Sequence, residues 1–177
     1  MRRASALERA RALGISVCDP AALLTERRIR QLEALQPGTV GAVALDRAGT
    51  IAAATSTGGM TGKLPGRVGD SALIGCGTYA ESTLGGVSCT GEGEAIIRVA
   101  LARRTLEILK IVDDPDRASE VALNVLVEEG RGDGGLILVD WKGRMAWAHS
   151  TPFMTVGLRS PSREHVVPPL PSRSASA

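Results

Sequence analysis

Residues 39–45 constrain the fold more than any other part of the sequence, because neither face of the strand that they predict is polar. The side chains are small or aliphatic on both sides: Val40, Ala42 and Ala44 on one and Gly41, Val43 and Leu45 on the other. A strand with two apolar faces is typical of one that is covered on both sides. Residues 46–49 have the composition of a hairpin turn, so we expect residues 50–55 to return as a second strand.

The composition favours closely packed layers of sheet and helix. Apolar residues make up 44% of the 177 residues but aromatic residues only 2%, so Ala, Val, Leu and Ile must build the core. A chain of this length is long enough for one domain with one sizeable core. We therefore expect an α/β sandwich.

The remaining periodicity predicts helices before and after this hairpin. Helical spacing runs over residues 5–13 and again over residues 19–35, where Pro37-Gly38 ends it. An amphipathic helix follows residue 94, and a second one spans roughly residues 115–129. Shorter apolar runs predict further strands around residues 72–75, 86–89, 134–140 and 145–149.

Charge and cysteine content exclude several classes of partner. The formal net charge is +2 and no basic block is interleaved with aromatic residues, so we expect no nucleic-acid partner. Cys18, Cys76 and Cys89 lack disulfide or metal-ligand spacing, and we expect them to be small buried hydrophobes in a reducing compartment. No apolar run approaches the roughly 20 residues that span a bilayer, and no signal-peptide core follows Met1. We expect a cytoplasmic protein with no membrane, metal or cofactor requirement.

Two glycine-rich stretches fail as nucleotide-binding motifs. Residues 58–64 lack the Ser or Thr that a phosphate-binding loop requires at its end. Residues 91–96 lack the third glycine of a dinucleotide fingerprint, and Glu92 would repel a pyrophosphate. His149 and His165 are isolated in the sequence, so we expect a packed and a solvated histidine and no Ser-His-Asp triad.

Four separate motifs carry a resemblance to a known family. In chain order they are GTVGAVALD (38–46), AAATSTGG (52–59), KLPGRVGDS (63–71) and SCTGEGE (88–94), and the likeness extends to GGLI (134–137). Together they resemble the plant-type L-asparaginase/isoaspartyl peptidase family of threonine N-terminal-nucleophile hydrolases. The resemblance covers most of the chain from about Asp19 to Met154. It implies a four-layer αββα sandwich whose precursor cuts itself before a threonine.

The resemblance also implies the catalytic residues. Cleavage would separate Gly38 from Thr39 and make Thr39 the nucleophile, with Thr57 orienting its hydroxyl. Thr90 and Gly91 resemble the oxyanion hole, where fixed donors typically contribute about 3 to 4 kcal/mol of transition-state stabilisation. An N-terminal threonine needs no histidine, because its own α-amine, with a pKa of roughly 7.7 to 8.0, can act as the general base.

Substrate recognition is implied by a second set of matching residues. Arg67 and Asp70 match the pair that holds the substrate's α-carboxylate and α-ammonium, and Gly91 and Gly93 lie in the substrate-binding loop. Arg provides a planar fork for a carboxylate and Asp a counter-charge for an ammonium, so the pair fits an amino-acid zwitterion. The implied reaction releases aspartate from L-asparagine or β-aspartyl (isoaspartyl) dipeptides. Hydrolysis of a glycosylamide, as in aspartylglucosaminidase, is an alternative.

The chain departs from the family before its nucleophile. Only 38 residues precede Thr39, whereas the family's α subunit is several times longer and brings its own strands, an asparagine beside the nucleophile and a sodium-binding loop. We expect residues 1–38 to be a helical remnant of that subunit and residues 39–156 to be the catalytic β-subunit-like domain. Residues 157–177 are rich in Ser, Pro and Arg and lack periodicity, which indicates a mobile tail.

An incomplete sandwich leaves unpaired sheet edges and uncovered apolar faces. We therefore expect a homo-oligomer or a complex with a separate α-like polypeptide. Three accounts stay open at this point: a split or truncated enzyme, a shortened stand-alone enzyme, and a non-catalytic descendant that keeps the scaffold for binding or assembly.

Overall fold

The computed structural model describes residues 38–161, the backbone of residues 163–171 and, before these, residues 8, 10–19, 22, 25, 26 and 29. Of the helix expected over residues 5–13, residues 8 and 10–12 are helical and residue 13 lies in a turn. The helix expected over residues 19–35 lies mostly outside the described residues. The chain forms two compact units, one of residues 1–38 and 58–68 and the other of residues 39–57 and 69–177.

The larger unit begins with the expected hairpin. Strands β1 (Thr39–Leu45) and β2 (Ile51–Thr57) pair antiparallel. The carboxylate of Asp46 closes the turn, since its Oδ1 accepts hydrogen bonds from the backbone N–H groups of Ala48 and Thr50, both at 2.8 Å. The prediction of two consecutive strands is confirmed.

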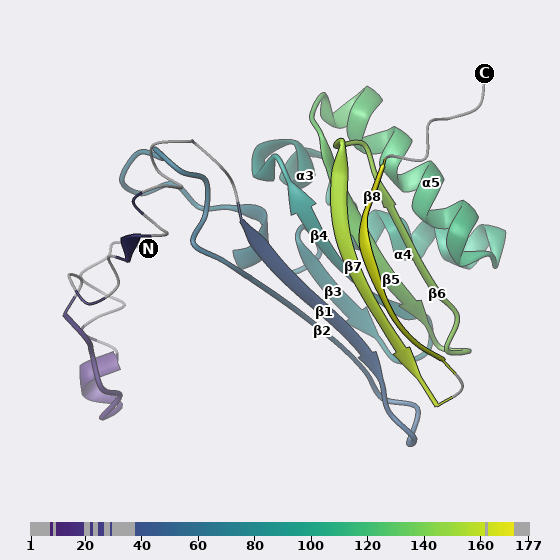
Figure 1. Cartoon of the computed structure of the whole chain (residues 1–177), viewed down its shortest axis with the longest axis horizontal. Coiled ribbons are helices and arrows are strands. Elements are labelled where there is room, and N and C mark those ends of the chain that lie inside the picture. The colour runs from purple at the N-terminus through teal and green to yellow at the C-terminus, as the bar shows by residue number, and fades with distance from the viewer. Residues whose placement is uncertain are drawn as a thin grey trace. The chain divides into compact units, whose positions relative to one another are not determined.

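A four-stranded antiparallel sheet lies beside the hairpin (Figure 1), in the order β3-β4-β5-β6. Its strands are β3 (Thr78–Glu81), β4 (Gly85–Gly91), β5 (Gly134–Asp140) and β6 (Met145–His149). The prediction of a strand over residues 72–75 is wrong. The chain there forms a short 3-10 helix, η2 (Asp70–Ala72), and then turns at Gly75, whose φ of 93° suits glycine.

Helices cover one face of this sheet. They are α3 (Gly93–Val99), α4 (Leu101–Val112) and α5 (Pro115–Val125), and α5 continues into a π-helical turn, η3 (Leu126–Gly130). The single helix expected after residue 94 is broken at Ala100, which has a left-handed φ of 49°. Asp114 caps α5 by accepting a hydrogen bond from the N–H of Arg117 at 3.1 Å, with Pro115 in the first turn.

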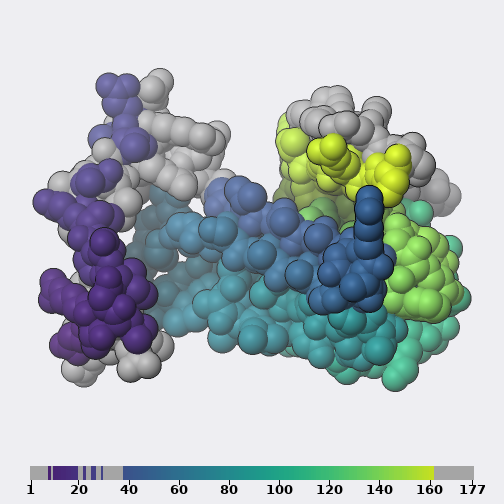
Figure 2. Space-filling view, turned by 90° about the horizontal axis from the view of Figure 1, so that it is seen from below, coloured from purple at the N-terminus to yellow at the C-terminus, as the bar shows by residue number. Residues whose placement is uncertain are grey.

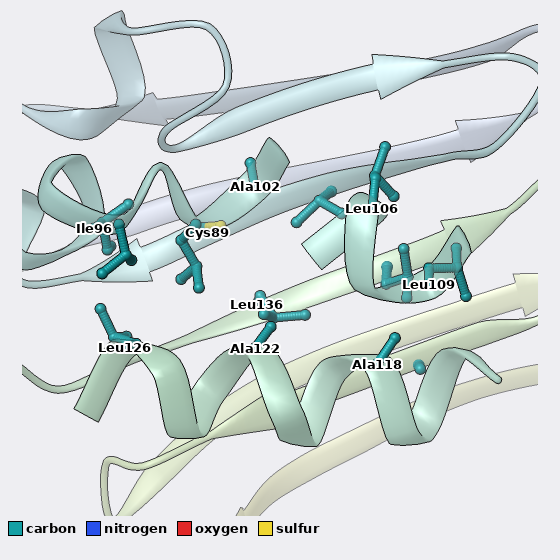
Figure 3. Close-up of a cluster of buried hydrophobic side chains, with 14 of the residues drawn as sticks. Cys89, Ile96, Ala102, Leu106, Leu109, Ala118, Ala122, Leu126 and Leu136 are labelled. Carbon is teal, nitrogen blue, oxygen red and sulfur yellow. The ribbon is translucent and has the colours of Figure 1, made fainter. Parts of the chain in front are cut away.

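The hydrophobic core lies between these helices and the sheet. Figure 3 shows Ala118, Ala122 and Leu126 directed from α5 and η3 towards Leu136 of β5. The labelled cluster is completed by residues of α4, α3 and β4: Ala102, Leu106, Leu109, Ile96 and Cys89. All of these side chains are small or aliphatic, as the low aromatic content predicts.

The β1–β2 hairpin packs against the opposite face of the sheet. A Cβ added to Gly86 of β4 would lie 2.7 Å from side-chain carbons of both Val43 and Ile51. By contrast, a Cβ added to the neighbouring Gly85 would lie 3.1 Å from Leu106 of α4. Adjacent residues of β4 therefore face the two different layers, as strand alternation requires.

The outer face of the hairpin is open in the part of the chain that the structure describes, and its atoms, in blue, lie at the surface in Figure 2. Val40 is 74% exposed, and Ala42 and Ala44 are also exposed. The expectation that β1 is covered on both faces is wrong for the described residues. An apolar pattern reports what a face tolerates, and it does not show that a covering layer is present.

Two further strands occupy much of the segment that was expected to be a tail. β7 (Phe153–Ser160) and β8 (Arg163–Pro171) pair antiparallel, with a register shift between Met154 and Val156. Val156 is only 4% exposed. Backbone pairing between two strands needs no side-chain periodicity, so the sequence pattern missed it. The described chain is thus a mixed α/β structure, and none of its described helices is long and apolar enough to cross a membrane.

Candidate active site

The hairpin register places two of the predicted site threonines opposite each other. Thr39 is the first residue of β1 and pairs with Thr57, the last residue of β2. The Thr39 hydroxyl donates a weak hydrogen bond to the Thr57 Oγ1 at 3.4 Å, which is longer than the usual range of about 2.5 to 3.0 Å for two hydroxyls. Thr57 therefore stands where it can orient the Thr39 oxygen.

A cavity of about 130 Å³ brings Thr39 together with the third predicted threonine, Thr90. Residues 88–90 of β4 and Gly41 of β1 form part of its wall, and β5 contributes Leu136 and Ile137. Residues 154–157 of β7 supply the remaining wall. The sequence did not predict that β7 borders the site, because it predicted no strand there and assigned the second half of this segment, from residue 157, to a tail.

Gly91 and Gly93 do not line this cavity. Gly91 has a φ of 136°, and a Cβ added there would lie 2.3 Å from the carbonyl oxygen of Asp133 and 2.4 Å from the Cα of Gly134. Only glycine fits this place, directly after Thr90. Gly93 is the first residue of α3 and is buried.

Asp70 is the first residue of η2 and is only 7% exposed. Its carboxylate lies against Gly77, since a Cβ added to Gly77 would be 2.4 Å from Asp70 Oδ2. Burial raises the pKa of the Cys76 thiol, and the negative charge of Asp70 raises it further. Burial, then the charge of Asp70 and then that of Cys76 hold the pKa of the Cys89 thiol well above its usual value. Asp70 thus creates a negative potential that an ammonium group would find favourable.

Arg67 belongs to the smaller unit, as does Gly38, whereas Asp70 belongs to the larger one. Within its own unit, the backbone N–H of Arg67 donates to the carbonyl of Leu64 at 3.2 Å. The Lys63 ammonium donates to the carbonyl of Gly58 at 2.6 Å in the same loop. The pairing of Arg67 with Asp70 around one substrate therefore stays a prediction.

The cysteines and His149 have structural places. Cys89 is buried and Cys76 is partly buried, as expected, but Cys18 is exposed, so the expectation of burial is wrong for this residue. It lies in residues 15–19, which form neither a helix nor a strand. His149 is packed at the end of β6 with its Nδ1 2.8 Å from the carbonyl oxygen of Thr151, as expected, while the side chain of His165 is outside the described residues.

Sequence reasoning missed two hydroxyls beside the predicted threonines. The Oγ atoms of Ser88 and Thr55 lie 2.6 Å apart between β4 and β2. Thr55 was passed over as part of the Thr55-Ser56-Thr57 run, and Ser88 as part of an apolar strand. The signal that could have found them is a hydroxyl at an inward position of each strand.

Comparison with known proteins gives the family. A family model described as asparaginase matches residues 33–167. The isoaspartyl peptidase/L-asparaginase of Danio rerio is 42% identical over 152 residues, which is 78% of this chain and 48% of that protein. The human protein of the same name is 40% identical over 161 residues, 78% of this chain and 52% of that protein. The plant-type L-asparaginase of Pyrobaculum calidifontis is 48% identical over 124 residues, 70% of this chain and 42% of that protein.

The chain thus spans about half the length of the curated relatives that it matches. The family model covers most of the chain, including every predicted site residue. This chain belongs to the plant-type asparaginase/isoaspartyl peptidase family.

Proposed function

We propose that this chain is the catalytic portion of an amidohydrolase that releases aspartate from L-asparagine or β-aspartyl dipeptides, with Thr39 as its nucleophile. The observation that carries the proposal is the convergence of Thr39, Thr57 and Thr90 from three strands, with Thr39 and Thr90 lining one cavity. Relatives that carry the names of these activities support the choice of reaction.

Self-cleavage of the Gly38–Thr39 bond is the first step of this proposal. It converts the backbone nitrogen of Thr39 into a free α-amine, whose unperturbed pKa of roughly 7.7 to 8.0 leaves it partly unprotonated at neutral pH. The Thr39 hydroxyl donates to Thr57 in the uncleaved chain. Once the amine takes this proton, the Thr57 hydroxyl can turn and donate to the Thr39 oxygen. No described histidine is required for this chemistry.

The Thr39 Oγ1 then attacks the side-chain carbonyl carbon of the substrate. Thr90 and Gly91 are the proposed donors to the resulting oxyanion. Collapse of the tetrahedral intermediate breaks the C–N bond, and the leaving amine departs with the proton that the α-amine took from Thr39. A β-aspartyl ester on Thr39 remains. Water hydrolyses this ester to aspartate and restores the Thr39 hydroxyl.

Substrate selection rests in this proposal on both charged residues. Arg67 binds the α-carboxylate and Asp70 the α-ammonium, with Gly91 and Gly93 leaving room for the substrate. The negative potential that Asp70 already exerts on Cys76 and Cys89 supports the second half of this assignment. Both residues recognise the aspartyl end only, so ammonia, an amino acid or a glycosylamine all remain leaving groups to be tested.

We further infer that the fold is an incomplete four-layer αββα sandwich and that another polypeptide completes it. Among the described strands, β1 pairs only with β2, and β7 pairs only with β8. A groove of about 500 Å³ runs between residues 41–45 of β1 and residues 156–161, with β5 and β6 as its floor. Unpaired edges and an open apolar face favour pairing with another polypeptide, either a separate α-like chain or a second copy of this chain.

The test is aspartate release by the purified chain, alone and after co-expression with its genomic neighbours. The panel contains L-asparagine, a β-aspartyl dipeptide and an aspartyl glycosylamine, and the matched control is Thr39→Ala. We expect release by the native sequence and none by the control. Release that appears only with a neighbour identifies a split enzyme. No release in any combination, from a folded chain, would contradict the proposal and favour the non-catalytic binding scaffold.

A further inference from the structure

A pair of hydroxyls, one buried and one partly buried, joins the β1–β2 hairpin to the strand that carries Thr90. Ser88 of β4 is 3% exposed, and its Oγ lies 2.6 Å from Oγ1 of Thr55 on β2. Thr55 Oγ1 also donates to the carbonyl oxygen of Gly77 at 3.0 Å. Since a hydroxyl has one proton, the Ser88 hydroxyl must donate to Thr55. Two hydrogen bonds in series therefore run from Ser88 through Thr55 to the carbonyl of Gly77.

A glycine on β1 fixes the position of these hydrogen bonds. Gly41 is the register partner of Thr55, and a Cβ added to Gly41 would lie only 2.2 Å from Ser88 Oγ. The Ser88 hydroxyl therefore occupies the space that a side chain at position 41 would fill. Thr39 and Thr57 form the next rung on the same face of the hairpin, two residues or about 6.8 Å away along each strand.

These hydrogen bonds also connect to two other parts of the proposed site, the strand of Thr90 and the residue Asp70. Ser88 and Thr90 are two residues apart on β4, so they lie on the same face, whereas Cys89 between them joins the core on the helical side. At the other end, the backbone N–H of Gly77 donates to the carbonyl of Asp70 at 3.2 Å. These hydrogen bonds thus connect the hairpin to the strand that carries Thr90 and, through Gly77, to the backbone of Asp70.

Between this pair and the hairpin turn, the side-chain contacts of the hairpin with the sheet are apolar, with Val43 and Ile51 against Gly86. At the far end of β2, the backbone N–H of Ile51 donates to Ser82 Oγ at 3.1 Å. Apolar layers tolerate small sliding movements, but a slide here would leave the buried Ser88 hydroxyl and the partly buried Thr55 hydroxyl without partners, and such groups are costly when unsatisfied. Buried polar pairs can in this way fix one register among several. We propose that Ser88 and Thr55 are a positioning pair that fixes the nucleophile hairpin on β4, so that Thr39 faces Thr90.

The catalytic consequence rests on the proposed function, but the positioning can be measured without it. The variants are Ser88→Ala, Thr55→Val, the double variant and the conservative Thr55→Ser. The matched control is Ser119→Ala, which removes a buried hydroxyl that has no hydrogen-bond partner among the described residues. The first readout is the unfolding midpoint in urea. We expect each single variant to lower it and the double variant to lower it by less than the sum of the two.

The second readout is the NMR resonance of the Thr39 methyl group in the full-length chain. Ser88→Ala and Thr55→Val should shift or broaden it, and Thr55→Ser and Ser119→Ala should leave it in place. The proposal would be overturned if the midpoint changes of the two single variants added up to that of the double variant. It would also be overturned if the Thr39 resonance stayed unchanged in both single variants. Neither readout depends on turnover, so an inactive chain would refute the proposed function and still decide this inference.

The third readout applies to the active form. A misplaced nucleophile raises the free energy of the transition state more than that of the substrate complex. Displacements of about 1 Å lower the rate on the order of 100-fold. We therefore expect Ser88→Ala and Thr55→Val to lower kcat by about 10- to 100-fold with little change in KM, and Thr55→Ser to restore most of it. An equal loss of kcat in Ser119→Ala would mean that general loosening, rather than positioning, is responsible.

Discussion

Replacement of Gly91 by alanine should damage both stability and the site, and the structure gives the size of the effect. The added Cβ would lie 2.3 Å and 2.4 Å from backbone atoms of Asp133 and Gly134, which cannot rotate away as a side chain can. The φ of 136° adds strain for any residue with a Cβ. Strain of about 1–3 kcal/mol and overpacking of about 1–3 kcal/mol together predict a loss of about 2–6 kcal/mol in the free energy of unfolding.

The assay is urea unfolding followed by far-UV circular dichroism, with Gly58→Ala as the matched control. A Cβ added to Gly58 would have no atom within 4 Å, and the φ of this residue is not positive, so its substitution should change the free energy of unfolding by less than about 0.5 kcal/mol. Gly91→Ala should also lose aspartate release, because the backbone after Thr90 must move. Equal unfolding midpoints for the two variants would refute the reasoning about residue 91.

Two further predictions concern ionisable groups. Hydrogen bonds from Lys142 and then from Arg144 hold the pKa of Asp113 below its ordinary value, so this carboxylate stabilises the fold above its unfolded pKa of about 3.9, and the contribution is lost as the pH falls through the lower folded value. Thermal unfolding of Asp113→Asn between about pH 5 and about pH 2 should therefore show a weaker pH dependence than the native chain, and an identical dependence would contradict this. The raised pKa and burial of Cys89 predict that a thiol reagent modifies exposed Cys18 first and Cys89 only on unfolding, as peptide mapping of a brief labelling reaction can check.

The sequence predicted those parts of the fold in which side-chain pattern and backbone agree. The β1–β2 hairpin follows from its turn residues, and α5 follows from the Asp114-Pro115 cap and its apolar stripe. The short strand β3 was missed because Thr78–Glu81 carries no apolar alternation and lies at the edge of the sheet, where β4 is its one neighbouring strand. The break at Ala100 was missed because the apolar stripe continues across it.

The candidate site was predictable only as far as its motifs reach. Family resemblance pointed to Thr39, Thr57 and Thr90, but a motif does not show that two of them share a cavity with residues of β7. That arrangement depends on how the layers pack, which local patterns do not report. Ser88 and Thr55 went unnoticed for the same reason, since their meaning comes from a contact between strands 33 residues apart.

The open face of β1 also shows where pattern reasoning ends. The apolar pattern of Val40 and its neighbours predicted a covered face, but the described chain leaves this face exposed. The relatives are about twice as long as the matched region. A covering layer from another polypeptide would reconcile the apolar pattern with the open surface.

The most direct test of the central claim is mass spectrometry of Thr39 itself. The chain, with any co-expressed partner that confers activity, is mixed with a β-aspartyl dipeptide, quenched in acid within the first turnovers and mapped by peptide fragmentation. The account predicts a new N-terminus at Thr39 and an aspartyl ester on its side chain, both absent from Thr39→Ala. An active preparation in which the Gly38–Thr39 bond stays intact, or in which the ester is found on another residue, would contradict it.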